Sequence, residues 1–98
     1  MRKVIELNFA NPETWAINGQ EFGKETFHRQ VEPVLPENLS DNEVQVVFPD
    51  NVVVITYTFW KGFTQEFIKT IGYENIFQKV EFKTSSDKLT RGLLNEIE

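Results

Sequence analysis

Short alternating or β-branched runs predict four strands along the chain. Residues 3–9 alternate apolar and polar side chains, the pattern of a half-buried strand. Residues 44–48 form a second β-branched run, and residues 52–55 are four β-branched residues in succession, which predicts a strand buried on both faces. Residues 80–83 alternate apolar with charged side chains, so we expect a strand at a sheet edge or one that is half exposed.

Three further stretches have the apolar spacing of amphipathic helices. The first is predicted to begin after Asn18, an N-cap residue followed three positions later by a glutamate, and to end near Pro33. The second begins at Phe59 and ends at Gly72, with apolar side chains four residues apart: Phe59, Phe63, Phe67 and Ile71. The third is capped within residues 85–87 and carries Leu89, Leu93 and Ile97.

Strands that alternate with helices predict an α/β domain with a mainly parallel, four-stranded sheet covered by about three helices. Ninety-eight residues are enough for one such domain, so residues 1–98 are expected to form a single unit. Nine Phe and two Trp would supply much of its core.

Composition narrows the classes of function. The formal net charge is −5 and basic residues are not clustered, which argues against direct binding to nucleic acid. The absence of cysteine excludes disulfides, thiolate zinc sites and a cysteine nucleophile, and it suits the cytoplasm. Glu6 interrupts the N-terminus before a signal-peptide core could form, so we expect no signal peptide. No apolar run approaches about 18 residues, so we expect no membrane span.

Motifs that would indicate catalysis are missing from the sequence. There is no glycine-rich phosphate loop, serine nucleophile elbow or HExxH zinc motif. His28 stands alone and is expected to be a solvated helix residue rather than a metal ligand or general base. The acids of the first helix are interspersed with Lys24 and Arg29, as on an ordinary charged face. We therefore expect no enzyme activity, no metal and no cofactor.

A cluster of hydroxyl groups precedes the second helix. Thr56, Tyr57 and Thr58 lie where the positive end of the helix dipole would stabilise a phosphate or another anion. A phosphate on Thr58 would add about −1.5 to −2 charge at pH 7 and could make or break a contact with a partner. The alternative is that Thr58 is the N-cap of this helix. Trp60 is either an exposed interface anchor or a residue at the edge of the core, and Trp15 carries the same two alternatives.

The arrangement resembles STAS-like domains, relatives of anti-sigma-factor antagonists found in bacterial and phage-derived genes. The resemblance spans roughly residues 15 to 97 and rests on Gly19-x-x-Phe22-Gly23-x-x-x-Phe27, on Val52-x-x-Ile55-Thr56-x-Thr58-Phe59, and on Gly72 followed by a strand and a helix. The chain departs from such domains with Val47 in place of an Asp, with Tyr57-Thr58 at the junction and with Trp60-Lys61-Gly62 after it. The resemblance implies a switchable protein-binding module whose partner is a kinase-like ATPase or a regulator of the sigma/anti-sigma type.

We therefore predict a regulatory module that binds a partner protein through this junction and the second helix, using Thr56, Tyr57, Thr58, Trp60, Lys61 and Thr64. Two alternatives stay open. One is an acidic phage or mobile-element antagonist of a nucleic-acid-binding protein, and the other is a small anion-binding enzyme or ligand-binding domain. A homodimer that pairs residues 80–83 with themselves is also considered, although the charges of this run would discourage such pairing.

Overall fold

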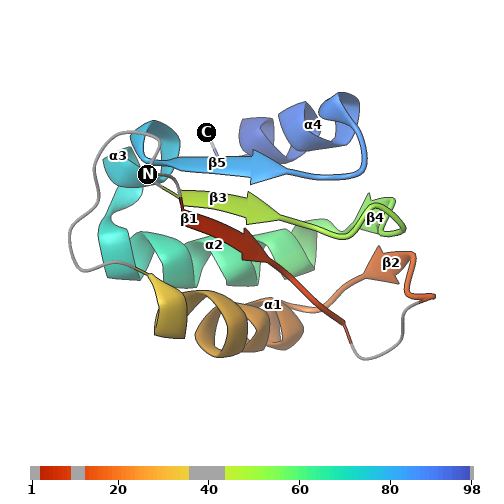
Figure 1. Ribbon diagram of the computed structural model, residues 1–98, viewed down its shortest axis with the longest axis horizontal. Coiled ribbons are helices and arrows are strands. Elements are labelled where there is room, and N and C mark those ends of the chain that lie inside the picture. The colour runs from red at the N-terminus through yellow and green to blue at the C-terminus, as the bar shows by residue number, and fades with distance from the viewer. Residues whose placement is uncertain (1–2, 10–12, 36–43, 98) are drawn as a thin grey trace.

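The main sheet of the protein has three parallel strands. The computed structural model describes residues 3–9, 13–35 and 44–97. Strands β1 (Lys3–Glu6), β3 (Val44–Val47) and β5 (Val80–Lys83) form this sheet in the order β1-β3-β5 (Figure 1). The predicted α/β class is confirmed, and so is the edge position of residues 80–83. The sheet has three strands rather than four because residues 54–55 pair elsewhere.

A second, two-stranded sheet lies at one end of the molecule. Strand β4 (Val54–Ile55) pairs in parallel with β2 (Ala16–Ile17), a short strand that the sequence pattern did not predict. Val53 is 54% exposed and Val54 is 39% exposed, so the expectation of a strand buried on both faces is wrong. The reason is that β4 pairs with β2 and not with the main sheet, which leaves these side chains in contact with solvent.

The helices cover one face of the main sheet. Helix α1 (Gln20–Thr26) continues into a π-helical turn, η1 (Phe27–Val31), and a short 3-10 turn, η2 (Glu32–Val34). Figure 1 shows α2 (Tyr57–Ile71) along the sheet, with α1 on one side and α4 (Asp87–Ile97) near β5. Helix α3 (Tyr73–Gln78), which was not predicted, joins α2 to β5.

The opposite face of the main sheet is partly or fully exposed. The register aligns its outward side chains in two rows across the three strands. They are Val4, Gln45 and Glu81 in one row and Glu6, Val47 and Lys83 in the other. The domain therefore consists of two layers, one of strands and one of helices.

The ends of the helices test the predicted caps. Asn18 is not the N-cap of α1: that position belongs to Gly19, whose φ of 98° is favourable for glycine alone. The predicted end of α2 is confirmed, since Gly72 is its C-cap and donates its N–H to the helix backbone at 2.7 Å. Capping of α4 within residues 85–87 is also confirmed, because Ser86 Oγ accepts the N–H of Leu89 at 3.2 Å.

Helices α1 and α2 approach each other closely through two glycines. A Cβ atom at Gly23 would lie 2.8 Å from the backbone nitrogen of Phe63, and one at Gly62 would lie 2.9 Å from the carbonyl carbon of Gln20. Beneath this contact lie six aromatic side chains that are at most 1% exposed: Phe27, Phe48, Phe59, Trp60, Phe63 and Phe67. The two glycines therefore let the α1 backbone lie directly against the helix that carries most of this core.

Candidate functional site

The junction before α2 is organised by Thr56. Its backbone is extended, with φ −71° and ψ 157°, and its N–H donates to the carbonyl of Ile17 at 3.1 Å. Its hydroxyl accepts the N–H of Phe59 at 3.4 Å, which makes Thr56 the N-cap. Helix α2 thus begins at Tyr57, two residues before the predicted start, because one residue both extends β4 and caps the helix.

Thr58 occupies the first turn of α2, and the alternative that made it the N-cap is wrong. Its Oγ1 accepts the N–H of Gly19 at 3.2 Å and lies 3.2 Å from the hydroxyl oxygen of Thr56. The Thr58 side chain thereby connects the start of α2 to the start of α1. The residue is exposed, so its hydroxyl stays accessible at the surface.

Trp60 and Thr64 do not belong to the exposed binding surface that the sequence predicted. Trp60 is 1% exposed, and its Nε1–H donates to the carbonyl of Leu93 in α4 at 2.7 Å. Thr64 is also buried, and its hydroxyl donates to the carbonyl of Trp60 at 2.8 Å. Of the two alternatives weighed for Trp60 the core position is correct, because an indole that packs between two helices and the sheet satisfies its N–H internally.

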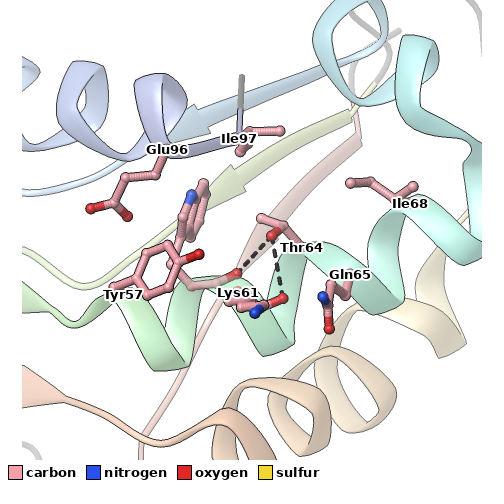
Figure 2. Close-up of a pocket in the computed structure, with 8 residues that line it drawn as sticks. Tyr57, Lys61, Thr64, Gln65, Ile68, Glu96 and Ile97 are labelled. Atoms are coloured by element: carbon pink, nitrogen blue, oxygen red, sulfur yellow. Dashed lines mark hydrogen bonds between the residues drawn. The ribbon is translucent and has the colours of Figure 1, made fainter.

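Four of the six predicted residues nevertheless meet at one hollow between α2 and α4. Figure 2 shows the side chains that line it, with Tyr57 and Lys61 supplied by α2 and Glu96 and Ile97 supplied by α4. The hollow has a volume of about 190 Å³ and is lined by Tyr57, Trp60, Lys61, Thr64, Gln65, Ile68, Glu96 and Ile97. Tyr57 is 55% exposed, and the Nζ of Lys61 lies 5.9 Å from the centre of its ring. Thr56 and Thr58 lie outside this lining.

The size and lining of this hollow limit its chemistry. Binding pockets for small molecules usually have volumes of about 300–1,000 Å³, so about 190 Å³ suits one or two side chains of a partner better than a cofactor. Its rim combines an aromatic ring, a cation and the exposed carboxylate-bearing residue Glu96. The sequence pattern missed the contribution of α4, although the apolar spacing that includes Ile97 already indicated an inward face for that helix.

Among the described residues, Trp15 is the most exposed of the large apolar side chains, with 62% of its surface accessible. It lies just before β2, and its carbonyl accepts the N–H groups of Val53 at 2.8 Å and Val54 at 3.1 Å. Trp15, Val53 and Val54 are therefore three exposed apolar residues at this end of the molecule. This position favours the interface alternative for Trp15.

His28 is part of an ion-pair cluster rather than a simply solvated residue. Its side chain is half exposed, but Nε2 lies 2.7 Å from Glu66 of α2 and Nδ1 lies 3.1 Å from Glu32. The hydrogen bond with Glu66 raises the pKa of His28, and it also lowers the pKa of the Glu66 carboxyl. Since both ring nitrogens face carboxylates, the arrangement is complete only when the ring is an imidazolium with two donors.

The remaining charged residues of α1 and η1 form the predicted charged face. Arg29 lies 3.1 Å from Glu25, and Lys24 lies 3.9 Å from Glu21, at the helical spacings that the sequence indicated. Over residues 3–9, 13–35 and 44–97, no three His, Asp or Glu side chains gather in a geometry that could hold a metal ion. Within the same residues, no helix is long and apolar enough to cross a membrane.

Comparisons of the chain with protein-family models, with curated proteins and with solved structures find no match.

Proposed function

We propose that this chain is a non-catalytic regulatory module that binds a partner protein through the first half of α2 and the hollow beside α4. The observation that carries the proposal is the exposed Tyr57 ring, held beside Lys61 at the rim of a hollow that is small for a cofactor. Tyrosine is enriched at protein interfaces because it offers a large apolar ring and a polar end.

The proposed surface differs from the one that the sequence indicated. Tyr57, Lys61 and Gln65 are its exposed part, while Trp60 and Thr64 form the floor of the hollow. A side chain of the partner would insert against this floor, and a carboxylate of the partner would pair with Lys61. In view of the resemblance to STAS-like domains, the proposed partner is a kinase-like ATPase or a sigma/anti-sigma type regulator, met in the cytoplasm.

Thr58 is the proposed point of control. Its hydroxyl is exposed on the first turn of α2, one residue from Tyr57, so a phosphate there would lie next to the binding surface. The phosphate would add about −1.5 to −2 charge at pH 7 and would be stabilised by the helix N-terminus. It would also crowd the hydrogen bond from Gly19. We expect phosphorylation at Thr58 to weaken binding of an acidic partner surface.

Capture of partners from native cells, with Tyr57→Ala and Lys61→Glu as baits beside the wild-type chain, tests this proposal. Each variant should reduce recovery of the partner by roughly tenfold, as for one good interface anchor. Lys83→Glu is the matched control, because this charge reversal lies on the exposed face of the sheet. Equal recovery with wild type and both α2 variants would rule out the α2 surface. Trp60 must stay intact in every bait, since its removal would disrupt the core.

A further inference from the structure

A larger groove lies beside strand β4, next to the hollow between α2 and α4, and Glu96 lines both. It has a volume of about 410 Å³, and Figure 1 places β4 between β2 and the start of α4. Strand β4 and the residue before it supply one wall, with Ile55 and Val53, and α4 supplies the other, with Leu89, Gly92 and Leu93. The groove is therefore bordered by a strand on one side and by a helix on the other. Its apolar lining is interrupted by Ser86, Lys88 and Glu96.

Among the residues that the structure describes, no strand pairs with the edge of β4 that faces away from β2. The N–H groups of Val54 and Thr56 donate to β2 and the residue before it, each at 3.1 Å, so these two residues direct their backbone groups toward β2. Backbone groups alternate in direction along a strand, so the N–H and C=O of Ile55 point away from β2. Neither group has a hydrogen-bond partner among the residues that the structure describes. A donor and an acceptor beside an apolar groove match the backbone of another extended segment.

The α4 wall has an opening at its centre and opposite charges at its ends. No atom lies within 4 Å of a Cβ built on Gly92, so the glycine leaves space in the groove. Lys88 and Glu96 line the same groove, and neither forms an ion pair with another described residue. Eight helical positions separate them by about 12 Å, the length of roughly four residues of extended chain.

We propose that the β4–α4 groove binds an extended apolar segment of a partner protein, which adds a third strand to the β2–β4 sheet through the backbone of Ile55. One apolar side chain of this segment inserts beside Gly92, between Ile55 and Leu93. An acidic residue of the segment lies near Lys88, and a basic residue lies near Glu96. The proposal does not rest on the α2 surface, which uses Tyr57 and Lys61, although Glu96 lines both cavities.

The test uses displayed random peptides of about ten residues, selected against the full chain and then titrated as synthetic peptides. The selected peptides should alternate apolar with polar residues and bind the Gly92→Ala chain as they bind wild type. Gly92→Phe should weaken binding by roughly tenfold or more, because the new ring occupies the place of a buried apolar side chain. Methylation of the one peptide nitrogen that donates to Ile55 should have a similar effect. Hydrogen exchange at the Ile55 amide should slow on binding.

Several outcomes would overturn the proposal. The first is a set of selected peptides without an alternating apolar consensus. The second is peptides that bind Gly92→Phe as tightly as wild type, with circular dichroism showing that the variant is folded. Binding lost in Lys61→Glu but kept in Gly92→Phe would assign the peptides to the α2 surface instead. If the chain self-associates and Gly92→Phe abolishes this self-association, the groove binds a second copy of the chain instead of a partner protein.

Discussion

The close contact of α1 and α2 makes a prediction that runs against ordinary helix propensity. Replacing glycine by alanine inside a helix usually stabilises a protein by about 1 kcal/mol. At Gly62, however, the new Cβ would lie 2.9 Å from the carbonyl carbon of Gln20 and closer still to its oxygen. Ordinary contact would require the two helices to separate by about 1 Å in a tightly packed interior, and overpacking of this kind costs about 1–3 kcal/mol. We expect Gly62→Ala to be destabilised by about 2 kcal/mol.

Gly92→Ala is the matched control for this prediction. Gly92 also lies inside a helix, but a Cβ there meets no atom within 4 Å, so the variant should gain up to about 1 kcal/mol. Urea unfolding monitored by circular dichroism gives both free energies, provided that the slope with denaturant stays constant. In a domain of this size the two melting temperatures should move apart by about 10 °C or more. Equal or greater stability of Gly62→Ala would refute the close contact of α1 with α2.

Three further predictions concern single side chains. Trp60→Phe should lose about 1–3 kcal/mol in urea unfolding, because the carbonyl of Leu93 loses a buried hydrogen bond; an unchanged midpoint would contradict this role. Thr56→Ala should cost about 1 kcal/mol as the loss of an N-cap, and a cost near zero would mean that the cap is elsewhere. The contribution of His28 to the free energy of unfolding is complete below the ordinary histidine pKa of about 6.5. It is lost as the pH rises through the raised pKa of His28 in the folded protein. The contribution of Glu66 to the free energy of unfolding is complete above the ordinary glutamate pKa of about 4.3. It is lost as the pH falls through the lowered pKa of Glu66 in the folded protein. Urea midpoints of wild type should therefore decline on either side of about pH 4.3–6.5, and His28→Gln should flatten the decline on the alkaline side.

The sequence by itself determined most of the longer strands and helices, but it indicated neither β2 nor α3. Alternation along residues 80–83 already required one buried and one exposed face, and β5 has both. The four-residue apolar spacing from Phe59 required a helix with one buried stripe, and Gly72 ended it because a left-handed backbone suits glycine. These features follow from local geometry, since side chains repeat every two residues in a strand and every 3.6 in a helix.

Only the tertiary structure decided which of these faces meet. The run at residues 52–55 predicts a buried strand, yet only Val54–Ile55 form one, and they pair with Ala16–Ile17 at one end of the molecule. Pairing partners distant in sequence leave no mark on local spacing. Trp60 lies one position from the phenylalanine stripe, and its burial depends on α4, which covers it and accepts its N–H. The hollow beside α2 and the groove beside β4 both need α4 as a wall. The sequence could not show which predicted residues form the rim of the hollow and which form its floor. The packing of α4, about 30 residues further along the chain, decides which of them are buried.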